Sequence, residues 1–130
     1  MALVALCVLL SQTQRLHSSV EIGSISEVRG NAQVLRDKPY GAELEFNIQQ
    51  MDDVRTEAGR VAITFEDDST VKLTEHSKLV IDEYIYDPDP SKSKMALKFA
   101  SGTARFITGK FNNKSNISIK TPTADIAIRG

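Results

Sequence analysis

Cysteine and histidine are both scarce in this chain. Cys7 is the single cysteine, and the two histidines, His17 and His76, stand far apart in the sequence. One cysteine cannot form an intrachain disulfide, and it excludes a zinc site built from several thiolates. His76 lies in "TEHSK", where a solvated turn is a simpler interpretation than a metal ligand or a proton-transfer role.

The chain also lacks an excess of charge of either sign. It has 16 Lys and Arg residues against 17 Asp and Glu residues, which gives a formal net charge of -1. The basic residues are interleaved with acidic ones, whereas nucleic-acid binding would need a clustered excess of basic residues. Nucleic acid is therefore not an expected partner. The proportions of 41% hydrophobic and 25% charged residues are ordinary for a soluble globular domain.

No apolar run reaches the roughly 20 residues that a membrane-spanning helix needs. The first ten residues, "MALVALCVLL", are almost wholly apolar, and "SQTQRLHSS" then turns polar. This layout is typical of a secretory signal peptide, although no basic residue precedes the run and no clean cleavage site follows it. We interpret residues 1–19 as a signal peptide or N-terminal apolar segment and residues 20–130 as one domain.

Three locations are compatible with that segment. Cleavage would leave a periplasmic or secreted protein, and an uncleaved segment would anchor the domain in the membrane, facing the periplasm. The third interpretation is a buried terminal segment of a cytosolic domain. We expect the first, with the membrane as a partner only through an uncleaved N-terminal segment.

Helical periodicity is nearly absent. Beyond residue 20 only residues 42–50 could form a short helical turn, and "AELEFNI" within them also alternates. Elsewhere apolar residues recur at every second position, the period of a half-buried strand. The candidate strands are 21–28, 31–36, 43–48, 60–66, 70–75, 78–87, 94–101, 102–109, 116–122 and 124–130. Many short strands joined by turn residues predict an all-β fold, as a sandwich, barrel or solenoid.

The stretch "RVAITFEDDSTVKL" predicts one hairpin in detail. Its apolar residues share one face: Val61, Ile63, Phe65, Val71 and Leu73. We predict that Phe65 lies opposite Val71 and Ile63 opposite Leu73, because a two-residue loop would bury Lys72 among apolar side chains. This register leaves residues 67–69 as a three-residue loop with one residue in the left-handed region, which Asp tolerates.

Catalytic and metal-binding machinery is not visible. Ser69 and Ser101 have no histidine near them in sequence, and Asp53, Asp67 and Asp68 fall at predicted turns where they have structural roles. The loop "DPDPSKSK" alternates Asp and Pro, but it lacks the glycine and the terminal Glu of an EF-hand loop. We therefore expect a protein that is not an enzyme and that holds no metal and no cofactor.

Four segments, in this order, resemble the FecR domain family: "IGSISEVRGNAQVLR", "DDVRTEAGRVAITFEDDSTVKLTEHSKLVI", "LKFASGTARFITGK" and "ISIKTPTADIAIRG". The resemblance covers residues 21–130 and rests on motif positions that we expect to be structural. These are Gly30, Arg36, Asp53, Val54, Thr56, Phe65, Asp67, Asp68, Ser69, Thr121, Pro122, Ala124, Ile128, Arg129 and Gly130. Asp52 and Asp68 stand where the family has Gly, so both are expected to need unusual backbone angles.

The resemblance implies a fold and a set of functions. The fold is a twisted β-solenoid-like stack of short hairpins, with a β-sandwich as the alternative, after the short apolar N-terminal segment. The best known members are periplasmic parts of transmembrane anti-sigma regulators involved in iron-uptake signal transduction. No sigma-binding part precedes residue 20 here, so we do not expect the anti-sigma role itself.

Two functions therefore remain open, besides the less favoured enzyme. The first is a non-catalytic extracytoplasmic binding or sensory module for an envelope protein or cell-wall component, whose exposed strand edges could accept a strand of the partner. The alternative is a fragment of a FecR-type transmembrane regulator.

Three further side chains could belong to a binding surface. Arg129 could hold a partner's carboxylate, although a salt bridge to a turn Asp or exposure to water is the simpler interpretation. Tyr84 and Tyr86, two positions apart in "DEYIYD", could form a binding surface, but cross-strand aromatic packing is the favoured role.

Overall fold

The alternation of apolar and polar side chains produces twelve strands in the part of the chain that the computed structural model describes. That part comprises residues 21–87, 89, 92–109, 117–122 and 125–129. The strands are β1 (Glu21–Arg29), β2 (Ala32–Leu35), β3 (Pro39–Gly41), β4 (Asn47–Gln49), β5 (Asp53–Thr56), β6 (Arg60–Phe65), β7 (Thr70–Leu73), β8 (Lys78–Ile85), β9 (Lys94–Ser101), β10 (Thr103–Ile107), β11 (Ile117–Lys120) and β12 (Asp125–Arg129).

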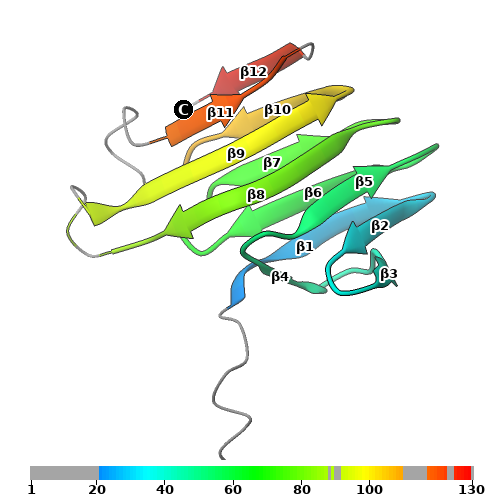
Figure 1. Cartoon of the computed structure of the whole chain (residues 1–130), viewed down its shortest axis with the longest axis horizontal. Coiled ribbons are helices and arrows are strands. Elements are labelled where there is room, and N and C mark those ends of the chain that lie inside the picture. Colours follow the sequence, from blue (N-terminus) through cyan, green and yellow to red (C-terminus); the bar gives the residue numbers. More distant parts are fainter. Residues whose placement is uncertain (1–20, 88, 90–91, 110–116, 123–124, 130) are drawn as a thin grey trace, which may run out of the picture.

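These strands form two six-stranded sheets. Sheet A has the order β12-β10-β7-β6-β1-β4, and sheet B has the order β11-β9-β8-β5-β2-β3. The chain passes back and forth between the two sheets, so that β3 and β4 lie at one end of the stack and β11 and β12 at the other (Figure 1). The all-β prediction is confirmed, and the arrangement is that of a sandwich built from stacked hairpins. The described residues contain no helix long and apolar enough to cross a membrane.

One hydrophobic core lies between the sheets. Ile25, Ile63 and Phe106 come from sheet A, Val54 and Phe99 come from sheet B, and all five are fully buried. Apolar side chains therefore point inward from both sheets, as aligned sandwich packing requires. Each such side chain contributes about 1.5–3 kcal/mol through burial.

The last four strands repeat with a constant offset. Met95 of β9 lies beside Ile117 of β11, and Thr103 of β10 lies beside Asp125 of β12, in parallel pairs. Both pairs are 22 residues apart, while every other strand pair is antiparallel. A parallel pair needs a crossover, and passage through the opposite sheet supplies it. This end of the described chain is therefore solenoid-like.

The predicted 61–73 hairpin exists, but its predicted register is wrong by two residues. The five apolar residues are buried on one face as expected, whereas the observed partners are Ile63 with Val71 and Val61 with Leu73. Ser69 is drawn into the ladder, where its carbonyl accepts a hydrogen bond from the Phe65 amide at 2.8 Å. The three-residue loop is therefore 66–68 instead of 67–69.

Alternation located most strands and missed the shortest. The predicted strand at 43–48 is wrong, because Glu45 adopts a left-handed conformation (φ 67°) and only Asn47–Gln49 pairs. No strand was predicted at residues 39–41, where β3 forms. None was predicted at residues 53–56 either, where β5 forms, although this segment contains three of the motif positions. The N-terminal segment 1–19, Ala124 and Gly130 lie outside the described residues.

Of the two positions expected to need unusual backbone angles, one is confirmed and one is wrong. Asp68 is left-handed (φ 69°), whereas Asp52 is not, and the left-handed residue beside it is Met51 (φ 69°). The Asp52 amide donates to the Gln49 carbonyl at 3.3 Å, which makes Met51 the third residue of a turn that favours glycine there. The position that favours glycine is therefore Met51, and Asp52 follows it.

Engineered disulfides distinguish the two registers of the 61–73 hairpin. In a Cys7→Ser background, Thr64→Cys/Thr70→Cys should oxidise readily, because directly opposite residues have Cα atoms ~5 Å apart, within disulfide range. Thr64→Cys/Lys72→Cys should remain reduced, because diagonal residues lie ~7–8 Å apart. Mass spectrometry after mild oxidation measures both, and the reverse pattern would restore the register predicted from the sequence.

Candidate functional site

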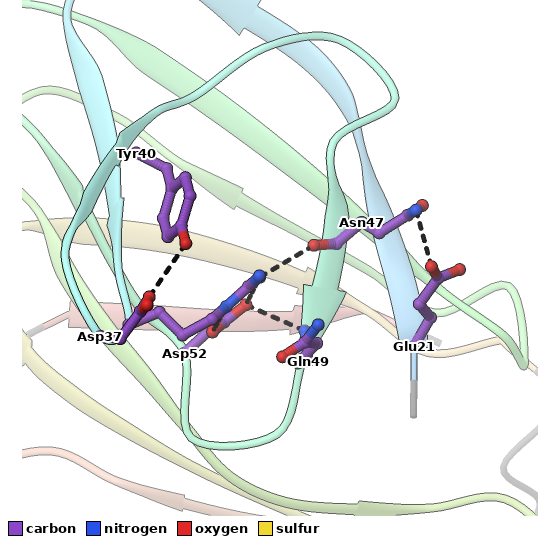
Figure 2. Close-up of polar contacts among 7 residues, drawn as sticks. Glu21, Asp37, Tyr40, Asn47, Gln49 and Asp52 are labelled. Carbon is purple, nitrogen blue, oxygen red and sulfur yellow. Dashed lines mark hydrogen bonds and ion pairs between the residues drawn. The ribbon is translucent and has the colours of Figure 1, made fainter. Parts of the chain in front are cut away.

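An ion pair fixes the end of the stack that carries β3 and β4. The Asp52 carboxylate is fully buried and accepts hydrogen bonds from Arg36 Nε (2.8 Å), Arg36 Nη2 (2.7 Å) and the Gln49 amide (2.9 Å). Figure 2 shows this cluster, in which Arg36 Nη2 also donates to the Asn47 carbonyl at 3.1 Å. The hydrogen bond to Asp52 raises the pKa of Arg36 above its ordinary value. Arg36 thus ties the segment after β2 to β4.

Aromatic rings enclose the same guanidinium. The Arg36 Cζ lies 5.4 Å from the centroid of Tyr40 and 5.3 Å from that of Phe46, which is cation–π distance. Tyr40 donates to Asp37 at 2.9 Å, and this hydrogen bond lowers the pKa of Asp37. Arg36 is thus held by Asp52, which was not among the motif positions, and by two aromatic rings.

A second buried carboxylate closes the turn after β6. Asp67 is fully buried and accepts hydrogen bonds from the Tyr84 hydroxyl (2.7 Å), the Ser69 amide (3.3 Å) and the Ser69 hydroxyl. Burial, followed by the hydrogen bond to Asp67, raises the pKa of Tyr84 far above its ordinary value. The Tyr84 ring stacks on Phe65 at 5.0 Å between centroids. Because Phe65 belongs to sheet A and Tyr84 to sheet B, the contact joins the two sheets.

The turn at 66–68 also leaves no room for a side chain at position 109. The Gly109 amide donates to Ser69 Oγ at 2.9 Å, and a Cβ at Gly109 would collide with the Asp67 backbone.

Tyr84 is buried, whereas Tyr86 lies beyond the end of β8 with 40% of its surface exposed. The two tyrosines therefore do not form one aromatic surface, and the packing of Tyr84 is between sheets instead of across strands.

A third polar cluster lies around Thr56. Its hydroxyl donates to the Thr74 carbonyl at 2.5 Å and accepts from the Ser77 amide at 2.9 Å. Gly30 lies in the same region with φ 69°, and a Cβ there would come within 2.5 Å of the Ala58 carbonyl oxygen. Both motif residues therefore hold connections between sheets, where backbone groups leave the strand ladders.

The remaining motif residues do not converge on these clusters. Asp53 lies on the outer face of sheet B, where its Oδ2 forms an ion pair with Arg55 Nη2 at 3.0 Å. Thr121 and Pro122 are exposed after β11. The backbone of Arg129, in β12, pairs with Ile107 of β10, while its side chain and Gly130 lie outside the described residues. The motif thus marks several structural positions instead of one cleft.

A polar groove of about 710 Å³ lies on the outer face of sheet B. One row of cross-strand neighbours forms its floor: Gly41, Gln33, Arg55, Lys78 and Ser101. Glu43, Glu57 and His76 lie at its border. Asp53 holds Arg55 in place and raises its pKa, whereas Lys78, Glu57 and His76 have no side-chain partner among the described residues.

The groove brings together one serine and one histidine that are far apart in sequence. Ser101 and His76 both line it, but no hydrogen bond joins their side chains within the described part of the chain. Ser69 is buried against Asp67 without a histidine. In the same described residues, no three His, Cys, Asp or Glu side chains gather as metal ligands do. The groove offers hydrogen-bonding and charged groups instead of a nucleophile with its base.

The family model described as FecR protein matches residues 52–130, which include the Thr56 and Asp67 clusters but neither Gly30 nor Arg36. No curated protein and no solved structure matches the chain.

Tyr84→Phe tests the buried Asp67 cluster through its dependence on pH. At pH 7 the variant should unfold with a free energy about 1–3 kcal/mol lower, because Asp67 loses a donor in the interior. A raised pKa in the folded state makes Tyr84 stabilise the wild type below the unfolded pKa near 10, and this stabilisation declines at higher pH. The difference between the two proteins should therefore shrink above about pH 10.

Urea unfolding of both proteins between pH 7 and pH 11 measures this difference. The contributions of the other titrating groups to the free energy of unfolding cancel in the difference, because both proteins carry the same groups. A difference that stays constant across this range, or grows, would show that Tyr84 is not held protonated by its surroundings.

Proposed function

Since the chain belongs to the FecR family, we propose that it is a non-catalytic, extracytoplasmic binding and sensory module of the FecR type. Family membership supports a role in regulation, and the polar groove on sheet B supports binding. The ligand is a polypeptide segment of an envelope protein. This location accords with the apolar segment at residues 1–19 and with a chain that has a single cysteine.

The observation that carries the proposal is the composition of the groove. Gln33, Arg55 and Lys78 lie side by side on three neighbouring strands, so their backbone positions are fixed before any ligand arrives. Preorganised groups lower the entropic cost of binding. Because Lys78 and the bordering Glu57 and His76 are without side-chain partners in the described part of the chain, they remain available to a ligand.

The mixture of charges favours a polypeptide. Lys78 offers a cation, Glu43 and Glu57 offer carboxylates, and Gln33 offers both a donor and an acceptor. A polypeptide presents donors and acceptors alternately along its backbone and carries side chains of either charge. A cell-wall component would satisfy some of these groups but would leave the acidic border without a partner.

A fragment of a transmembrane FecR-type regulator is the second candidate, and the family match favours it equally. Both candidates use the same binding face. They differ in whether the module acts as a separate protein or as one domain of a transmembrane regulator. A sensory domain that binds an envelope protein fits either one.

Site-specific photo-crosslinking in cells that produce the full chain tests the groove. A photoreactive amino acid at Gln33 or Lys78 should give one discrete protein adduct, because both positions line the groove. The same amino acid at Lys98, exposed on the outer face of the same sheet but outside the groove, serves as the matched control and should give none.

Glu57→Lys should abolish the adduct formed at Gln33 while the unfolding free energy stays within about 0.5 kcal/mol, as for most surface substitutions. Equal adducts at all three positions, or none at Gln33 and Lys78, would contradict the proposed binding face.

A further inference from the structure

Four basic side chains gather on the outer face of sheet A. Arg29, Arg60, Lys72 and Arg105 lie on β1, β6, β7 and β10, which are four consecutive strands of the sheet, and all four are exposed. Their cross-strand register places Arg29 opposite Arg60 and Lys72 opposite Arg105. Although the sequence is nearly neutral, four of its basic residues therefore share one face of sheet A, which we call the basic face.

The basic face opposes stability instead of supporting it. Like charges directly opposite each other on neighbouring strands are destabilising. None of the four cations forms an ion pair with another described residue. Sheet B is different, because Lys94 lies 3.0 Å from Glu83 and Lys98 lies 3.4 Å from Asp82. Three outward cations of sheet B, namely Arg55, Lys94 and Lys98, are thus paired with carboxylates, whereas the four of the basic face are not.

A hollow of about 360 Å³ lies among these cations. Arg60, Lys72 and Arg105 line it together with the hydroxyl-bearing Thr74 and Thr103. Glu27 is the single carboxylate in this lining, so cations outnumber acids there by three to one. Such a site concentrates anions, because exposed charges of one sign around a hollow reinforce one another.

The side chains around the hollow indicate what kind of anion fits. Ser26 and Thr64 add hydroxyls to the same face, where Thr64 Oγ1 donates to Ser26 Oγ at 2.9 Å. No aromatic residue points outward from β1, β6, β7 or β10, since Phe65 and Phe106 are buried. A single-stranded nucleic acid would call for aromatic stacking platforms. The exposed large hydrophobic residues of the described chain lie on other segments, so a membrane surface would gain no apolar insertion here.

We infer that the basic face binds a linear acidic polysaccharide, a polymer that carries carboxylates along a chain rich in hydroxyls. Neighbouring strands are about 4.8 Å apart, so the four cations span ~14 Å across the sheet. A polymer that crosses the strands meets one cation on each of them. Its carboxylates pair with the guanidinium and ammonium groups, while its hydroxyls exchange hydrogen bonds with the Ser and Thr side chains. This site is separate from the groove on sheet B.

Titration calorimetry with a short oligogalacturonate and the full chain tests this inference. Wild-type protein should bind the acidic oligomer and not its fully methyl-esterified, neutral form. Lys72→Gln/Arg105→Gln should weaken binding about tenfold, since two exposed charge pairs are lost. The matched control Lys94→Gln/Lys98→Gln removes the same charge from sheet B and should leave the affinity within about twofold of wild type, because neither residue faces the polymer.

Several results would overturn the inference. Equal weakening by both double variants would mean that only net charge matters. Equal or tighter binding of inorganic phosphate, of anionic lipid vesicles or of a single-stranded oligonucleotide would assign the face to another ligand, and so would the absence of binding by wild type. Urea unfolding provides a second measurement: Lys72→Gln/Arg105→Gln should be at least as stable as wild type, because it removes a repulsive pair. A clear loss of stability would mean that the two cations have a structural role.

Discussion

The structure depends on satisfying the backbone wherever the chain leaves a strand, at a crossing between the sheets or at a tight turn within one of them. At such points some amides leave the strand ladders while still inside the molecule, and an unpaired buried amide costs about 1–3 kcal/mol. Three buried side chains supply the missing acceptors. Asp52 accepts from the Gln49 amide, Asp67 from the Ser69 amide, and Thr56 from the Ser77 amide. Arg36 and Tyr84 then complete two of these three clusters. Asp52 and Thr56 thus lie where the chain of this FecR-family protein crosses between the sheets, and Asp67 lies at the turn between β6 and β7 of sheet A. The outer faces remain for binding.

Much of the fold could be predicted from the sequence, because alternation determines which face of a strand is buried. It identified the long strands and the common face of Val61, Ile63 and Phe65. It could not choose between two registers that differ by two residues, since both bury the same side chains. The choice depends on Ser69 joining the ladder beside a buried Asp67, whose partner Tyr84 comes from the other sheet. A contact between residues so far apart leaves no local pattern. For the same reason the position that favours glycine was assigned to Asp52, one residue after the left-handed Met51.

The candidate binding surfaces could not be predicted, because they consist of residues that only the register brings together. Gln33, Arg55 and Lys78 are distant in sequence and adjacent in sheet B. The interleaving of acidic and basic residues suggested an evenly solvated surface, yet ion pairs gather on sheet B while Arg29, Arg60, Lys72 and Arg105 share a face of sheet A. Composition counts charges and does not say on which side of a sandwich they lie. The two outer faces are therefore chemically distinct, one mixed in charge and one basic.

Hydrogen exchange followed by NMR tests the role of the three buried acceptors most directly. The amides of Gln49, Ser69 and Ser77 should exchange nearly as slowly as the core amide of Ile63, because each donates to a buried side chain that opens only when the sandwich opens. Exchange of these three amides at the fast rates of exposed loops would show that Asp52, Asp67 and Thr56 do not hold these connections, and it would contradict the account of the fold given above.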